Sequence, residues 1–154
     1  FQVYQEDEDT WEVTEKLEGS TCIYAWLEDG LHACTTSVDF LENPTQPVWA
    51  MAHAMQLKEK LETVFGQAGA RRVALYGEWV GPGVEGNIYR LDTPQYFVFQ
   101  VYEVDKGRWW DMDERQNVAS TLGIGHAPVI HEAWTLSSEV SAEQLLAMAN
   151  GPSG

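Results

Sequence analysis

The stretch RVALYGEWVGPGVEGNIY, residues 72–89, carries the strongest structural signal in the chain. Its first half, residues 72–80, is rich in large apolar side chains and predicts a β-strand. Three glycines and a proline follow within residues 81–86, so the backbone can turn there and come close to a bound molecule. Residues 87–91 and 96–104 then predict two further strands.

More strands are expected toward the N-terminus. Residues 11–15 alternate between apolar and polar side chains, and so does much of residues 21–27. The turn at residues 28–30, with residues 31–37 behind it, predicts an antiparallel hairpin. The acidic run at residues 6–9 is expected to be a solvated arm.

Helices are expected between and after these strands. Residues 47–65 predict two helical pieces, with Pro47 in the first turn and an apolar stripe formed by Leu57, Leu61, Val64 and Phe65. Capping boxes at Asp111 and Ser141 predict two short helices that end near Gly123 and at residues 150–152. Strands mixed with helices, without strict alternation, indicate an α+β fold with antiparallel sheets in one compact body.

Composition and charge narrow the functional class. The 154 residues fit one domain or a piece of a larger one, and 44% hydrophobic residues exclude a disordered chain. A net charge of −15 excludes a nucleic-acid binder that works through a broad basic face. With no apolar run of roughly 18 residues and no basic leader, we expect no membrane span and no signal peptide. The chain begins at Phe1 rather than Met, which suggests a fragment.

Two familiar kinds of site are disfavoured. Residues 81–86 match G-x-G-x-x-G, but Pro82 stiffens the turn and a strand is expected where a dinucleotide site needs a helix. Two cysteines are too few for a disulfide framework, so Cys22 and Cys34 are expected to be small apolar residues in a cytoplasmic protein. The histidines lack the spacing of a closed zinc site: His32, His53, His126 and His131.

Two other residues are candidates for chemistry. Lys16 lies at the end of a predicted strand, where a partly desolvated amine can act as a nucleophile, although an exposed lysine is the simpler interpretation. Glu78 lies on an apolar strand, where a carboxylate is unfavourable unless it is paired, binds a metal or accepts hydrogen bonds. The glycines that follow Glu78 suggest a binding edge, with a purely structural turn as the alternative.

Read in order, these segments resemble one family. EKLEGS, residues 15–20, resembles motif I of the covalent nucleotidyltransferases, the superfamily of polynucleotide ligases and mRNA capping enzymes. YGEWVGPG, residues 76–83, continuing to GNIY at residues 86–89, is similar to motif III of its ATP-dependent RNA ligase branch. YFVFQVY, residues 96–102, resembles motif IIIa.

The resemblance implies a nucleotidyltransferase fold of ATP-grasp-like type, with antiparallel sheets around a nucleotide cleft. It implies that Lys16 attacks ATP to form lysyl-AMP, which passes to an RNA 5′-phosphate before strand sealing, with Mg²⁺ or Mn²⁺ as cofactor. Glu78 matches the carboxylate that engages the ribose or a metal-bound water, and Phe99 the aromatic that stacks on adenine. Glu15 corresponds to a base contact, and Gly19 lets the backbone turn beside the nucleotide.

The sequence departs from the family pattern in two places. Residues 34–37 read CTTS, where an arginine is expected in the family, which puts contact with the RNA terminus in doubt. Motifs IV and V are expected after a segment like residues 150–154, so the chain is expected to be a partial adenylylation domain over residues 1–154. RNA ends or nicks would then need the missing part or a partner chain for binding.

Our interpretation is therefore an ATP-dependent RNA ligase of the RNA-repair type. Three alternatives stay open at this point. One is a related DNA ligase or a GTP-using capping enzyme, which differs in the nucleotide or strand used. Another is a catalytically incomplete remnant that binds a nucleotide or a partner. The third is an acidic mimic of nucleic acid, which the charge alone favours.

Overall fold

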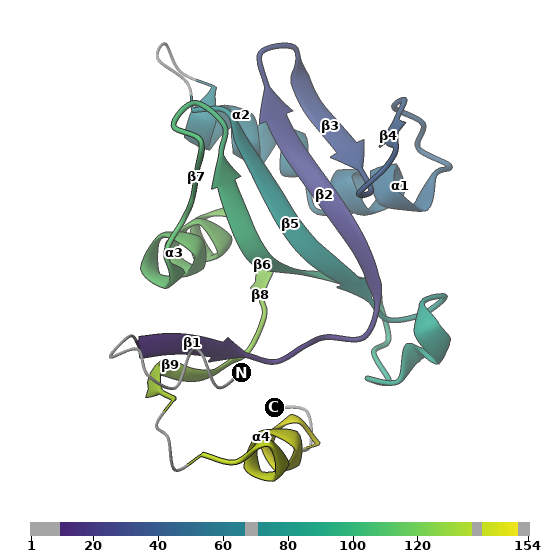
Figure 1. Cartoon of the computed structure of the whole chain (residues 1–154). Helices are drawn as coiled ribbons and strands as arrows, with labels where there is room; N and C mark the ends of the chain where they lie inside the picture. The colour runs from purple at the N-terminus through teal and green to yellow at the C-terminus, as the bar shows by residue number, and fades with distance from the viewer. Residues whose placement is uncertain (1–9, 67–70, 137–139, 151–154) are drawn as a thin grey trace. The chain divides into compact units, whose positions relative to one another are not determined.

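The computed structural model describes residues 10–66, 71–136 and 140–150, which form two compact units (Figure 1). The larger unit is Leu17–Ala127, and the smaller one joins residues 10–16 to the chain after Ala127. The first strand pairs with a late strand that the sequence did not reveal, and both strands belong to the smaller unit. The acidic run at residues 6–9 and the glycine end at residues 151–154 lie outside the described residues.

The larger unit is built on a seven-stranded sheet in the order β4-β3-β2-β5-β6-β7, with β8 paired to β6. All pairs are antiparallel except β6 with β8, which confirms the expected sheet type. The strands are β2 (Ser20–Leu27), β3 (Gly30–Cys34), β4 (Asp39–Phe40), β5 (Val73–Val80), β6 (Gln95–Glu103), β7 (Arg108–Trp109) and β8 (Gly125–His126).

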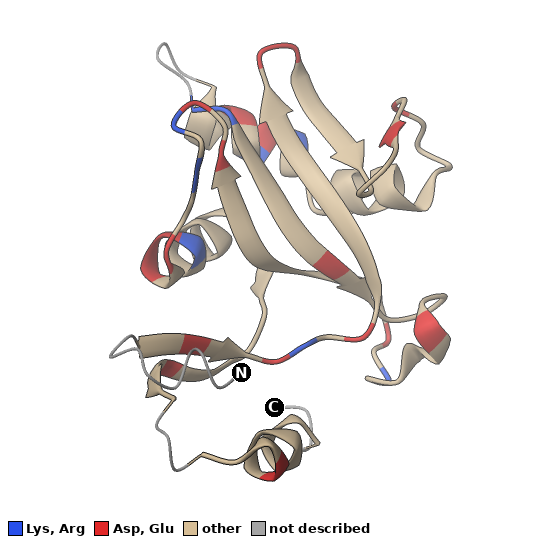
Figure 2. Ribbon diagram, viewed as in Figure 1, with Lys and Arg blue, Asp and Glu red and all other residues tan. Residues whose placement is uncertain are grey.

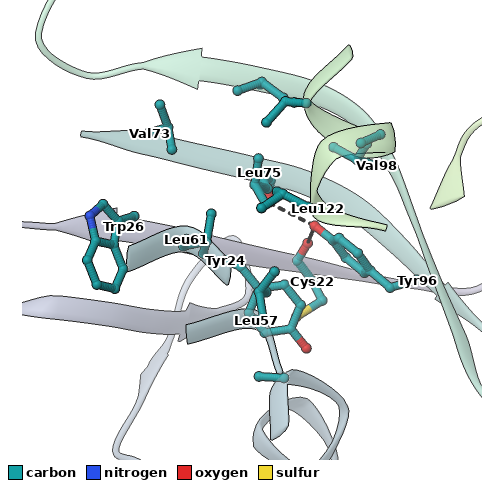
Figure 3. Packing of buried hydrophobic residues seen from close by; sticks show 14 of the residues in the cluster. Cys22, Tyr24, Trp26, Leu57, Leu61, Val73, Leu75, Tyr96, Val98 and Leu122 are labelled. Atoms are coloured by element: carbon teal, nitrogen blue, oxygen red, sulfur yellow. Dashed lines mark hydrogen bonds between the residues drawn. The ribbon is translucent and has the colours of Figure 1, made fainter. Parts of the chain in front are cut away.

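Three helices pack their apolar side chains against one face of this sheet (Figure 3). They are α1 (Pro47–Ala54), α2 (Leu57–Phe65) and α3 (Met112–Leu122). The α2 stripe is buried at Leu57, Leu61 and Phe65, whereas Val64 is 37% exposed. The predicted capping box of Asp111 is present, and Gly123 caps the other end of α3.

Residues 87–91 do not form the predicted strand. The chain instead makes a short 3-10 turn, η2 (Glu85–Asn87), and continues as turns. The Asn87 side chain explains the difference, because its amide group donates to the Leu91 carbonyl and accepts from the Leu91 N–H. An asparagine that satisfies nearby backbone groups in this way favours a loop over a strand.

The centre of the sheet depends on a close approach between two strands. The buried Tyr96 of β6 lies over Gly77 of β5, and its hydroxyl lies 3.1 Å from the Cys22 carbonyl and 2.9 Å from the Leu75 carbonyl (Figure 3). A Cβ at residue 77 would meet the tyrosine ring and lie 2.6 Å from its oxygen. Only glycine therefore fits beneath this ring.

A histidine links the β2–β3 turn to the edge strand β4. His32 Nε2 lies 2.9 Å from Asp29 Oδ1, and its Nδ1 lies 2.9 Å from Asp39 Oδ2. Both ring nitrogens can donate only when the imidazole is protonated. The hydrogen bond to Asp29, and after it the one to Asp39, raises the pKa of His32 above its ordinary value.

The smaller unit contains a two-stranded antiparallel ribbon and a helix. β1 (Thr10–Thr14) pairs with β9 (Val129–Thr135), and the helix is α4 (Ala142–Ala149), whose predicted capping box at Ser141 is present. Leu146 of α4 is 63% exposed. Across the described residues, none of the helices is both long enough and apolar enough to cross a bilayer.

Replacing Gly77 with alanine should destabilise the fold, because the added methyl group overlaps the hydrogen-bonded ring of Tyr96. We expect Gly77→Ala to lower the free energy of unfolding by about 1–3 kcal/mol, the usual cost of overpacking. Urea unfolding followed by tryptophan fluorescence measures it. An unchanged midpoint would contradict the close approach of the two strands.

The pH dependence of stability should report the His32 link. Because the pKa of His32 is higher in the folded state, its contribution is complete below the unfolded value of about 6.5 and is lost as pH rises through the folded value. The urea midpoint of the wild-type chain should therefore fall more than that of His32→Gln between about pH 6 and pH 9. Parallel profiles for the two proteins would contradict this link.

Candidate functional site

Glu15 and Lys16 follow the last residue of β1 and belong to the smaller unit. The Glu15 N–H donates to the Pro128 carbonyl at 2.9 Å, so the pairing of β1 with the β9 segment continues one residue beyond the strand. Lys16 comes next and is exposed. The predicted position of Lys16 near a strand end is confirmed.

Gly19 and Glu78 are brought together in the larger unit. A Cβ on Gly19 would meet the Trp79 carbonyl oxygen, and it would lie 2.8 Å from Val80 Cγ1 and 3.0 Å from Glu78 Cγ. Glycine is therefore required where the chain enters β2 beside β5. This close approach fixes the backbone that follows Lys16 against the strand that carries Glu78.

Glu78 is held by a cross-strand hydrogen bond. Thr21 of β2 pairs directly with Glu78 of β5, and the threonine Oγ1 donates to Glu78 Oε2 at 3.1 Å. A carboxylate on an apolar strand is unfavourable unless it has a polar partner. The half-buried Glu78 has such a partner in Thr21. Sequence reasoning missed Thr21, because only the strand register places it opposite Glu78.

Phe99 lies at an irregularity in β6. Tyr76 pairs with Gln100 and Gly77 pairs with Val98, so Phe99 is left without a partner on β5 and forms a β-bulge. Residues 96, 98, 101 and 103 of β6 are buried, whereas Phe99 and Gln100 are both half-buried. The bulge therefore accommodates one extra residue without moving the buried positions to the other face.

Glu78 and Phe99 lie on the face of the sheet opposite the helices, here called the outer face. Its centre is a cluster of strand residues that includes Ile23, Ala74 and Tyr76. Side chains alternate along β5, so Glu78 shares this face with Tyr76. Trp109, 50% exposed, contacts the rings of Tyr76 and Tyr102 with centroid distances of 5.1 and 4.9 Å.

The glycine-rich loop after β5 touches the segment that follows Lys16. The phenolic oxygen of Tyr89 accepts a hydrogen bond from the Glu18 N–H at 2.7 Å. Sequence reasoning placed Tyr89 within motif III but gave it no role. Its contact joins residues 71 positions apart, and no local sequence pattern reports such a bond.

Several basic residues gather at the end of the larger unit away from the glycine-rich loop, around the start of β5 and the β6–β7 turn (Figure 2). The buried Glu103 carboxylate binds Lys106 at 3.0 Å and Arg108 at 3.1 Å, and Trp110 Nε1 donates to it. Burial acts to raise the pKa of Glu103, but the hydrogen bonds from Lys106 and Trp110 and the charges of Lys106 and Arg71 outweigh it and hold the pKa below its ordinary value.

A cavity of about 230 Å³ lies at the same end, and Arg71, Arg72, Glu28 and Asp105 contribute to its lining. Arg72 binds Asp105 at 2.6 Å and Glu28 at 3.3 Å. Carboxylates therefore already engage these cations, and the cavity contains none of the predicted site residues.

The cysteines are not activated thiols. Cys22 is buried, and burial raises its pKa to about 11. Burial, and after it the hydrogen bond to Asp39, raises the pKa of Cys34 to about 12. Both values are far above those of nucleophilic cysteines, which agrees with the expected passive role.

Within the described residues, no group of three or more histidine, cysteine or acidic side chains is arranged to hold a metal. Glu78 alone could contribute one carboxylate to an Mg²⁺ or Mn²⁺ ion. That donor set fits an ion held largely by nucleotide phosphates and water, as is common for Mg²⁺, rather than one enclosed by protein.

A family profile described as RNA ligase matches residues 9–150. A comparison with curated proteins found no match.

Among solved structures, the chain is similar to the Naegleria gruberi RNA ligase at 29% identity, with TM-scores of 0.85 for a variant with ATP and Mn and for the ligase with PPi. A variant with AMP and Mn gives a TM-score of 0.84 at the same identity. Each match covers 99% of this chain and 44% of the solved ligase.

The chain thus spans less than half the length of these solved ligases, and it matches them over nearly all its own residues. The α+β fold with antiparallel sheets agrees with this likeness. Since the profile extends over most of the chain, the chain belongs to the RNA ligase family.

Proposed function

We propose that the chain is the N-terminal part of the adenylylation domain of an ATP-dependent RNA ligase. The observation that carries the proposal is the fixed position of Gly19, three residues after Lys16, against the strand that bears Glu78. This arrangement occurs in a chain of the RNA ligase family, and its solved relatives have ATP, AMP or PPi together with the ligase.

In this proposal, the uncharged Lys16 amine attacks the α-phosphorus of ATP. The N–P bond forms as the bond to pyrophosphate breaks, and the amine proton passes to solvent. The AMP group then moves to an RNA 5′-phosphate, and a 3′-hydroxyl displaces AMP to join the strands. Lys16 is exposed in this chain.

Glu78, Phe99 and Glu15 would bind and orient the nucleotide. The half-buried Glu78 carboxylate, oriented by Thr21, would accept hydrogen bonds from the ribose or from water on the metal. Phe99 would stack on adenine from the bulge of β6, and Glu15 would contact the base. A bound Mg²⁺ or Mn²⁺ would neutralise phosphate charge in the transition state.

A second candidate is a catalytically incomplete member of the family that binds a nucleotide or a partner. The observation that favours it is the pairing of Arg72 and Arg108 with carboxylates, which leaves little positive charge for RNA at that end of the larger unit. A ligase that seals DNA would use the same adenylylation step, and a comparison of nicked RNA and nicked DNA substrates separates the two.

The nucleophile assignment predicts one labelled residue. We expect incubation with α-labelled ATP and Mn²⁺ to add AMP to Lys16 at low stoichiometry, because the chain is less than half as long as the solved ligases. Radiolabel counting detects the product, and peptide mass spectra locate it. Lys16→Ala should abolish the label, and Lys58→Ala, which changes an exposed lysine of α2, is the matched control.

Either of two results would contradict the Lys16 assignment. One is a label that survives Lys16→Ala. The other is no label above background in the wild-type chain after long incubation, which would favour the incomplete, binding-only alternative.

The stacking assignment predicts weaker nucleotide binding in Phe99→Ala. Base–aromatic stacking contributes about 1–3 kcal/mol, so the dissociation constant for ATP should rise roughly tenfold to a hundredfold. Isothermal titration calorimetry measures it. Phe97→Ala, a half-buried aromatic two residues away on the same strand, is the control. Equal losses in the two variants would show that Phe99 has no special contact with the base.

A further inference from the structure

The hydrogen bond between the Glu18 N–H and the Tyr89 hydroxyl connects two segments of the proposed site. One segment follows the proposed nucleophile Lys16, and the other is the glycine-rich loop after β5. The Glu18 N–H lies two residues after Lys16, and the accepting oxygen of Tyr89 lies at the end of the glycine-rich loop after β5. At 2.7 Å the bond is short, and Tyr89 is half-buried. A half-buried side chain has fewer positions available than an exposed one and can hold its partner in place.

The loop that carries Tyr89 is itself well defined. Successive backbone hydrogen bonds run from the Val84 N–H to the Gly81 carbonyl, from Asn87 to Val84, and from Arg90 to Asn87. Val84 is only 6% exposed and anchors the loop in the larger unit. Asn87 and Arg90 have positive φ angles of 51° and 52°, unusual for residues other than glycine and typical of functional loops.

Two residues shortly after Glu18 are also held in place by contacts with β5. Gly19 is pressed against the β5 backbone, and Thr21 is hydrogen-bonded to Glu78. The bond to Tyr89 therefore holds the backbone two residues after Lys16. Two residues of extended chain span at most about 7 Å, so the position of Glu18 limits the reach of the Lys16 backbone.

We propose that Tyr89 is a positioning residue for the nucleophile, acting by holding the Glu18 backbone and so restricting the chain from which Lys16 extends. The proposal rests on the proposed function, because it assigns Tyr89 a role in the adenylylation step. Tyr89 need not touch the nucleotide. Its hydroxyl acts through the backbone, so loss of that hydroxyl should slow the reaction of bound ATP more than it weakens ATP binding.

The test compares Tyr89→Phe with Tyr102→Phe in the full 154-residue chain. Each variant loses one phenolic hydroxyl and keeps its ring, but Tyr102 packs its ring against Trp109, away from the Glu18 contact. The rate of Lys16 labelling by ATP and Mn²⁺ is measured over a range of ATP concentrations. The Glu18 amide is followed in parallel by ¹H–¹⁵N NMR and hydrogen exchange.

Tyr89→Phe should lower the maximal labelling rate by about three- to tenfold, which corresponds to the loss of one hydrogen bond, and leave the KM for ATP within about twofold. Its Glu18 amide proton should shift upfield and exchange faster. Tyr102→Phe should match the wild type in both measurements. A purely structural role would instead change the melting temperature without this separation of maximal rate from KM.

Wild-type labelling rates in Tyr89→Phe, an effect confined to KM, or an unchanged Glu18 amide would each overturn the role of Tyr89 and leave the proposed function intact. Absence of Lys16 labelling in the wild-type chain would overturn the proposed function, and the role of Tyr89 with it.

Discussion

The buried phenol of Tyr96, seated over Gly77, is the contact on which the larger unit depends. Its hydroxyl lies within hydrogen-bonding distance of carbonyls on β2 and β5 while its own backbone belongs to β6, so one side chain ties three strands together. Glu78 is the next residue after Gly77, and the bulge at Phe99 begins three residues after Tyr96. The positions of both candidate ligand contacts therefore follow from a side chain that itself belongs to the core.

Much of the larger unit could be predicted because its signals are local. Strands β5 and β6 contain dense apolar runs, and α3 begins and ends with the predicted capping box and glycine. The pairing of β1 with β9 could not be predicted, since it joins residues more than a hundred positions apart. The strand predicted at residues 87–91 is wrong, because Asn87, Ile88 and Tyr89 are typical of strands but the Asn87 side chain closes a turn with Leu91.

The candidate site also combines residues that local sequence patterns indicate with residues that only long-range contacts bring to the site. Residue types and order pointed to Lys16, Gly19, Glu78 and Phe99, and the packing of Gly19 against β5 gives a physical reason for one of them. Thr21 and Tyr89 were not identified, because their contacts arise from strand register and loop closure. Likewise, a count of basic residues in the sequence treats every arginine equally, whereas Arg108 in the folded chain binds Glu103 and Glu114. The positive charge available to a ligand is therefore smaller than the number of basic residues indicates.

The bulge in β6 also bears on how such a site can change over evolutionary time. Phe99 is the one residue of β6 that interrupts the ladder between the Val98 and Gln100 pairs, and the buried positions on either side of it keep their face. A deletion of this single codon would restore regular alternation from Tyr96 to Glu103 without moving Val98 or Val101 out of the core. The aromatic ring on the outer face can thus be gained or lost as one inserted residue, independently of the core that supports it.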